Sequence, residues 1–260
     1  MTQYENEVKK RDVMCCMNAG NQGCGRKWSR MRIITDTGTD ILDKEAKKLG
    51  IELVAIRSNF TDTVFSENTE AEFTRFYDKL RQTDTLPVSS QPSPAEFLEL
   101  FEDAKEKEEE VVVITISSKL SGTYNGAMLA KDMAEYDNIY VVDSLLASLS
   151  ERLLVEYAVK LRDAGMGAKE LVQKLEQDRE RVILTGVPST LLYLKMGGRI
   201  SPVVAAVGGV IGIKPVLWLK DGVIESRSKA RGMRMAKSGM QSFLKDYEAC
   251  LLYTSPSPRD

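Results

Sequence analysis

Short apolar segments alternate with amphipathic helical segments along most of this 260-residue sequence, and this alternation is the strongest constraint on its fold. Residues 111–116 form a continuous apolar run, which is typical of a strand buried on both faces. Because strands that alternate with helices tend to pair in parallel, we expect an α/β fold whose mostly parallel sheet has helices on both faces. Further strands are expected at 32–35, 51–60 and 139–142, and helices at 41–49, 69–82, 93–109, 122–136, 145–164 and 168–181.

Several of these helices carry capping signals in the sequence. Asp40 is the expected N-cap of the first helix, and Gly50 is expected to close it. Thr69 and Ser93 each precede a glutamate by three residues, which is the pattern of a capping box. Pro94 follows Ser93 at the first helical position, where proline is favoured.

The pattern changes after residue 181, where the regular alternation of strands and helices stops. Asp221-Gly222 lies between two apolar runs, and this arrangement predicts a hairpin with a type I′ turn. The last periodic segment is a helix, and no further strand or helix is expected after it. The expected elements are strands at 182–187, 214–220 and 223–228 and helices at 190–195 and 232–247.

These patterns divide the chain into two domains with an extra segment at each end. We expect an N-terminal α/β domain at residues 31–180 and a C-terminal α+β domain at 181–249, which we expect to be incomplete. Residues 1–30 have no strand or helix period, so they are interpreted as a non-native or disordered extension. Residues 250–260 resemble translated adapter read-through, and we expect both ends to lie outside the fold.

The composition argues against several classes of protein. The sequence has no histidine, which removes His-based catalysis and His metal sites, and Cys15, Cys16 and Cys24 lack a fourth ligand for a metal. The formal net charge of −2 gives no electrostatic support for nucleic-acid binding. No apolar run reaches the roughly 18 residues of a membrane helix, and the N-terminus lacks the apolar region of a signal peptide. We therefore expect a cytoplasmic protein with no membrane span, metal or other cofactor.

Two serine-rich segments, residues 88–93 and 116–124, stand directly before expected helices. The second follows the buried strand, so it lies at the carboxyl edge of the sheet, where open α/β sheets bind ligands. Helix N-termini offer free N–H groups that suit an anion, although serines there often serve only as caps, as expected of Ser93. No Walker phosphate loop and no nearby arginine pair is present, so a singly charged carboxylate fits better than a phosphate.

Six short motifs occur in the order and at the spacing of a known family, and from Met31 to about Glu248 the chain resembles the DegV family of fatty-acid-binding proteins. The motifs are TDT at 35–37, SSQPS at 89–93, SSKLSGTY at 117–124, VDS at 142–144, GGRIS at 197–201 and IKP at 213–215. The resemblance implies a two-domain fold with an acyl chain buried between or within the domains. The family usually has threonine in place of the first serine of SSQPS, and it usually has a histidine-containing C-terminal segment that has no counterpart here.

The resemblance also implies roles for individual residues, and these describe a carrier rather than an enzyme. Ser89 and Ser121 are expected to hold the carboxyl group of a long-chain fatty acid. The bound acid is expected to be handed to a partner such as a fatty-acid kinase, and Arg199 is expected to be exposed and to contact that partner. Ser90, Ser118, Gly122 and Thr123 are expected to support the site, and the apolar stretch 203–213 is expected to be core that also lines the acyl pocket.

A metal-dependent phosphatase-like hydrolase is the alternative function. Asp36, Asp40 and Asp143 follow or end expected strands and could together hold Mg²⁺. The segment from Ile33 onward resembles the start of the haloacid-dehalogenase motif, but Gly38 stands where the second aspartate should be, which removes the general acid. Caps and turns are the ordinary role of such aspartates.

Overall fold

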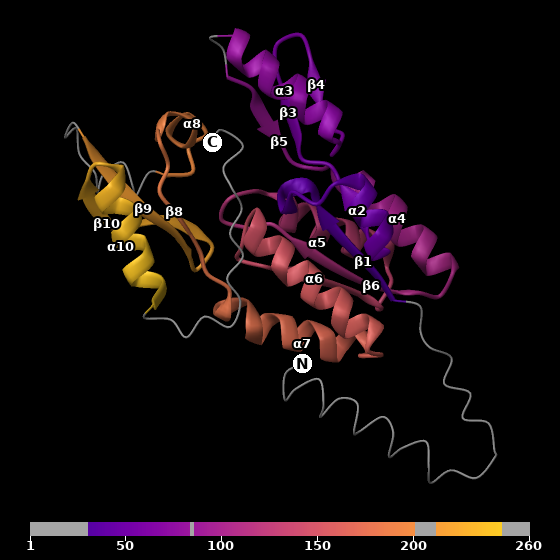
Figure 1. Ribbon diagram of the computed structural model, residues 1–260. Coiled ribbons are helices and arrows are strands. Elements are labelled where there is room, and N and C mark those ends of the chain that lie inside the picture. The colour runs from indigo at the N-terminus through magenta and orange to yellow at the C-terminus, as the bar shows by residue number, and fades with distance from the viewer. Residues whose placement is uncertain (1–30, 84–85, 201–211, 246–260) are drawn as a thin grey trace.

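The computed structural model describes residues 31–83, 86–200 and 212–245. Our expectations for 1–30, for most of 203–213 and for 250–260 fall outside these residues. Within them the chain forms an α/β region followed by an α+β region, which confirms the predicted fold class (Figure 1). None of the helices in the described ranges has both the length and the apolar character needed to cross a bilayer.

A four-stranded parallel sheet forms the centre of the first region. Its strand order is β2 (Glu52–Val54), β1 (Met31–Asp36), β6 (Glu110–Thr115) and β7 (Ile139–Asp143), and all of its pairings are parallel. The apolar run in β6 occupies the interior of this sheet, where all its residues after Glu110 are buried. This confirms the parallel sheet predicted from the alternation of strands and helices.

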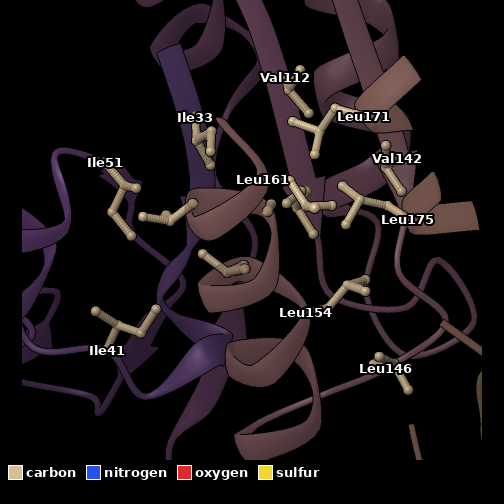
Figure 2. Packing of buried hydrophobic residues seen from close by; sticks show 14 of the residues in the cluster. Ile33, Ile41, Ile51, Val112, Val142, Leu146, Leu154, Leu161, Leu171 and Leu175 are labelled. Atoms are coloured by element: carbon tan, nitrogen blue, oxygen red, sulfur yellow. The ribbon is translucent and has the colours of Figure 1, made fainter. Parts of the chain in front are cut away.

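Helices cover both faces of the parallel sheet, and the side chains of each strand alternate between two cores. Ile33 and Val112 pack with α6 (Leu149–Asp163) and α7 (Ala168–Asp178), and Ile41 joins the same core just before α2 (Asp43–Leu49) (Figure 2). Ile34 and the other face of β6 pack against α4 (Pro94–Glu106) and α5 (Thr123–Ala134). Each face therefore has its own hydrophobic core, as a doubly covered sheet requires.

The expected strand at 51–60 is wrong as a single element, because the chain leaves the parallel sheet after β2. Its second half, β3 (Arg57–Asn59), pairs antiparallel with β4 (Val64–Phe65) and β5 (Val88–Ser90) in a separate sheet. This sheet and α3 (Glu70–Gln82) form a lobe at the top of Figure 1, built around Phe60, Phe65 and Phe76. The sequence predicted the helix of this lobe but not its sheet, in which β3 pairs with nearby β4 and with β5 about thirty residues further along the chain.

The expected helix caps hold in part. The Thr69 side chain accepts a hydrogen bond from Glu72 N, and both the N–H and the hydroxyl of Ser93 donate to the Glu96 carboxylate. Asp40 is not an N-cap: it lies in the left-handed region after the short 3₁₀ turn η1 (Thr37–Thr39), and α2 begins only at Asp43. The helix expected from residue 145 also begins later, at Leu149, because the backbone at 145 and 148 has positive φ.

The second region is an antiparallel sheet of order β10-β9-β8, with β8 (Leu184–Gly186), β9 (Ile213–Lys220) and β10 (Val223–Arg231). The predicted hairpin is confirmed, and Asp221 and Gly222 have φ of 49° and 84°, the signs that a type I′ turn requires. The helix α10 (Met233–Lys245) packs on this sheet, where its Phe243 ring meets Trp218 edge-on. Two further short helices, α8 (Leu192–Met196) and η2 (Arg179–Arg181), complete the described elements.

Candidate functional site

The loop of residues 116–122, which joins β6 to α5, is held by the side chains of two aspartates. Ile116 N donates to Asp36 Oδ2 over 2.8 Å, and Ser118 N donates to Asp143 Oδ1 over 3.1 Å. Asp36 ends β1 and Asp143 ends β7, the strands on either side of β6. The neighbouring strand ends therefore fix the backbone of this loop, which places it at the carboxyl edge of the sheet as predicted.

Ser117 connects the same loop to the second region of the protein. Its amide donates to Leu146 O, and its buried hydroxyl donates to Gly222 O in the turn of the β9–β10 hairpin, both over 2.8 Å. A Cβ atom on Gly222 would lie 2.5 Å from Ser117 Oγ, and its φ of +84° disfavours any side chain. The turn therefore needs glycine both for its own conformation and for its close approach to Ser117.

The three aspartates of the Mg²⁺ hypothesis use their carboxylates as acceptors inside the protein. Asp36 accepts backbone N–H groups, Asp40 Oδ2 accepts the Ser148 hydroxyl over 2.5 Å, and Asp143 accepts amides of its own and the neighbouring loop. Burial raises the pKa of Asp36 to about 6 and also raises the pKa of Asp40. The geometry therefore gives these aspartates the positioning roles that caps and turns usually have, and it gives no support to a phosphatase.

The other serine-rich segment, residues 88–93, begins in β5, an edge strand of the lobe, rather than in a loop. Ser89 pairs with Ser58 of β3, and Ser90 Oγ accepts a hydrogen bond from Asn59 Nδ2 over 2.9 Å. Both serines are exposed. This segment therefore presents its hydroxyls from a thin antiparallel sheet with little packing behind it.

The two serine segments meet through Gln91 and Gly122. A Cβ atom on Gly122 would lie only 2.0 Å from Gln91 Oε1, so the glutamine side chain occupies the space that the glycine leaves free. Segments that are about thirty residues apart in the sequence are thereby brought face to face.

A cavity of about 330 Å³ opens where these two segments face the second region. Its lining combines hydroxyl groups, an amide, aliphatic side chains and one guanidinium group. The lining residues are Ile56, Ser89, Ser90, Gln91, Ile116, Leu120, Ser121, Gly122, Tyr193, Leu194, Gly197, Arg199 and Ile224.

Five residues predicted for the site line this cavity, namely Ser89, Ser90, Ser121, Gly122 and Arg199, and two others do not. Thr123 is fully buried behind the lining, with its hydroxyl 2.9 Å from Ser121 Oγ. Ser118 is held through its amide by Asp143, as described above. Thr123 and Ser118 are thus placed to support the lining residues rather than to contact a ligand.

Arg199 is exposed, as the sequence predicted, but it also belongs to the cavity. Its Nε donates to Leu120 O over 3.2 Å, and its NH1 group donates to Gly197 O. Among the described lining residues it is the only one with a charged side chain. The cavity therefore has a cation at its exposed side and neutral donors elsewhere.

Sequence reasoning missed most of the apolar lining. Ile56 lies in the segment that was expected to continue a single strand, and Ile224 and Leu194 come from the second region. No local pattern marks these residues as facing a ligand, because their shared cavity depends on how the two regions pack. The apolar stretch that the sequence predicted to line an acyl pocket, 203–213, lies mostly outside the described residues.

The lining is suited to an amphiphile with an anionic head. Aliphatic side chains can cover an apolar tail, while serine hydroxyls can donate hydrogen bonds to a carboxylate. Acidic side chains are missing from the lining within the described part of the chain, so an anion meets no like charge there.

The chain is similar to several known proteins. A family model described as "Uncharacterised protein, DegV family" matches residues 30–251. A DegV domain-containing protein of Caldanaerobacter subterraneus is 31% identical over 217 residues, which cover 84% of this chain and 77% of the relative. A DegV domain-containing protein of Halalkalibacterium halodurans is 33% identical over 209 residues, which cover 80% and 74%.

Solved structures show the same fold. A fatty-acid-binding DegV family protein from Thermus thermophilus matches with a TM-score of 0.75 and 31% identity, over 84% of this chain and 78% of that one. A stearic-acid-binding protein from Eubacterium ventriosum matches with a TM-score of 0.75 and 28% identity, over 83% of this chain and 75% of that one.

Proposed function

Because this chain belongs to the DegV family, we propose that it binds a long-chain fatty acid and presents its carboxyl group to a partner such as a fatty-acid kinase. The observation that carries the proposal is the cavity in which the Ser89 and Ser121 segments face aliphatic side chains and one guanidinium. Similar structures are described as fatty-acid-binding proteins, which supports the same ligand here.

The tail and the head of the ligand contribute differently to its binding. Burying roughly 14 methylenes stabilises the complex by about 11 kcal/mol before the costs of association and ordering are subtracted. A hydrogen bond to a charged group contributes only about 1.5–3 kcal/mol net. The acyl chain therefore supplies most of the affinity, and the hydrogen bonds decide which end of the ligand faces outward.

We assign the carboxyl group to the hydroxyls of Ser89 and Ser121. Ser90 and Gly122 complete the lining around it, while Ser118 and Thr123 hold the Ser121 loop from behind. Arg199 at the exposed side is then close to the carboxyl end, where a partner must approach in order to modify it.

The surroundings of Ser121 favour binding over catalysis. A serine nucleophile needs a neighbouring base to remove its proton. The nearest polar partner of Ser121 Oγ is the Thr123 hydroxyl, which is no base, and the chain contains no histidine. The same hydroxyl is well suited to donate to a carboxylate.

Mass spectrometry of lipid extracted from the purified chain tests the proposal. We expect long-chain fatty acids at a stoichiometry that approaches one per chain, and saturable rebinding after delipidation. The Ser93→Ala variant should retain this lipid, because Ser93 caps α4 and is absent from the cavity lining. Purified chain that carries no fatty acid and binds none on titration would contradict the proposal.

The role of the partner needs a separate test with Arg199→Ala. We expect fatty-acid affinity within about twofold of wild type, because Arg199 is exposed and its guanidinium already donates to Leu120 O and Gly197 O, but slower acyl-phosphate formation by a fatty-acid kinase. If Arg199→Ala abolished fatty-acid binding, the residue would belong to the carboxyl site and not to a docking surface.

A further inference from the structure

Glu151, in the first turn of α6, is a buried carboxyl group whose role is not explained by the cavity. It is 0% exposed, and neither of its oxygens has a hydrogen-bond partner among the described residues. The Thr35 hydroxyl on β1 is also buried and acts on the Glu151 carboxyl, although no hydrogen bond of normal geometry joins it to a described group. Since an unpaired buried charge is very costly, Glu151 is held in its neutral form.

The charged neighbours of Glu151 also favour its neutral form. Burial raises its pKa well above the ordinary value, and the negative charges of Asp36, Asp40 and Asp143 raise it further. The Thr35 hydroxyl opposes this rise. Of the neighbouring cations, Arg152 lowers the pKa of Asp40, and the Arg179 guanidinium donates to the main-chain oxygen of Asp143.

Asp36 is the second member of this pair. Its Oδ2 accepts from Ile116 N over 2.8 Å and its Oδ1 from Gly38 N over 2.9 Å. A Cβ atom on Gly38 would lie 2.7 Å from Asp36 Oδ1 and 3.4 Å from Glu151 Oε2, so the two carboxyl groups flank the same glycine. Burial is the main cause that raises the pKa of Asp36 to about 6, and the two backbone donors oppose it.

The pair is connected directly to the cavity. Ile116 lines the cavity, and it begins the loop that carries Ser121. Hydrogen bonds from an amide to an ionised carboxylate are about twice as strong as neutral ones, so the charge on Asp36 strengthens the attachment of this loop. Loss of that charge weakens the attachment without any change at the cavity itself.

We propose that Asp36 and Glu151 form a buried carboxyl pair that positions the Ser121 loop, with Asp36 ionised and Glu151 protonated in the binding-competent state. At acid pH, protonation of Asp36 weakens its bond to Ile116 N and loosens the loop. At alkaline pH, ionisation of Glu151 places a second negative charge beside Asp36 and disturbs the same attachment. Loop order and ligand affinity therefore follow a bell-shaped dependence on pH.

Amide hydrogen exchange of residues 116–118 in the ligand-free protein tests the pair without reference to any ligand. Protection factors, corrected for intrinsic exchange, should be highest near neutral pH and fall at least tenfold toward pH 5 and again at alkaline pH. In Asp36→Asn, protection should be low at every pH, so the fall toward pH 5 should be absent. In Glu151→Gln, protection should match wild type at neutral pH, and the fall at alkaline pH should be absent. Asp132→Asn, on the exposed side of α5, should match wild type.

Affinity for a fatty acid, measured in parallel, should fall about tenfold in Asp36→Asn at pH 7.5 and stay within twofold in Glu151→Gln. This second readout rests on the proposed function. A bell-shaped protection profile in a chain that binds no fatty acid would uphold the pair and contradict only the proposed function. The proposed pair would be contradicted if protection still fell toward pH 5 in Asp36→Asn, or if it fell at alkaline pH in Glu151→Gln as it does in wild type.

If Asp36→Asn does not fold, carbon-13 NMR titration of the side-chain carboxyl groups in the wild-type protein gives the answer. Asp36 should titrate near pH 6, and Glu151 should titrate well above its ordinary range and after Asp36. A Glu151 that ionises in its ordinary range or before Asp36 would overturn the proposal.

Discussion

The two serine segments of the cavity are held in very different ways. Ser121 lies in an anchored loop, residues 116–122, which follows an interior strand and whose amides donate hydrogen bonds to Asp36 and Asp143 at the ends of β1 and β7. The Ser89 segment is an exposed edge strand of a small lobe, which is connected to α4 by the paired side chains of Arg57 and Glu96. We infer that the loop defines where the carboxyl group sits and that the lobe completes the site around it.

The largest effect that would test this comparison is expected at Gly222, where the second region meets the anchored loop. Gly222→Ala should destabilise the protein by about 2–4 kcal/mol, because the side chain is strained at this φ and displaces the Ser117 hydroxyl. Gly232→Ala is the matched control, since Gly232 has a similar φ of +79° but no atom within 4 Å of its Cβ position. Denaturant unfolding should show a clearly smaller loss for the control, about 1–2 kcal/mol. Equal losses would mean that the contact with Ser117 adds nothing.

The next effect separates the two serines directly. Ser121→Ala should weaken fatty-acid binding by about 10- to 100-fold, because a rigid loop cannot bring another donor to the carboxylate. Ser89→Ala should cost less, about two- to fivefold, because the strand is exposed and Ser90 lies beside it in the cavity lining. Ser93→Ala should leave affinity unchanged and lower stability by about 1 kcal/mol through loss of the cap. A larger loss for Ser89→Ala than for Ser121→Ala would reverse the comparison.

The smallest expected effect is on the pH dependence of stability, and it comes from the buried side chain of Glu151. The folded state keeps Glu151 protonated above the pH at which the unfolded chain ionises, so the contribution of Glu151 to stability falls as pH rises from about 4.5. Glu151→Gln removes this cost, and its melting temperature should exceed that of wild type by a few degrees at pH 8 and by nothing at pH 4. Glu170→Gln is the control, since Glu170 occupies the same first-turn position of α7 but is exposed. A difference that does not depend on pH would show that Glu151 is not protonated in the fold.

The sequence predicted those parts of the fold that depend on local pattern. The apolar run of β6, the hairpin at Asp221-Gly222 and the cap at Ser93 are all read from a few adjacent residues. The sheet of the lobe was missed because residues 51–60 look like one strand, although Ala55 and Ile56 carry the chain from one sheet to another. The two arrangements differ only in how the second half of this segment pairs, with β4 and with distant β5.

The candidate site was likewise predictable only in part. The serine-rich motifs and their resemblance to a family indicated Ser89 and Ser121, which the structure brings to one cavity. The partners that position them, Asp36 behind Ile116 and Gly222 against Ser117, were not predictable, because each joins groups about 80 or more residues apart. Glu151 gave no signal, since a glutamate in the first turn of a helix is ordinarily a solvated residue that favours the helix dipole.

The most direct test of the account compares a long-chain fatty acid with its methyl ester, which keeps the tail but removes the charge. Equilibrium binding of both ligands should be measured for wild type and for Ser121→Ala. We predict that wild type prefers the acid by at least tenfold and that this preference shrinks to a few-fold in Ser121→Ala, while the ester binds both proteins about equally. An undiminished preference for the acid in Ser121→Ala would contradict the claim that the anchored loop holds the carboxyl group.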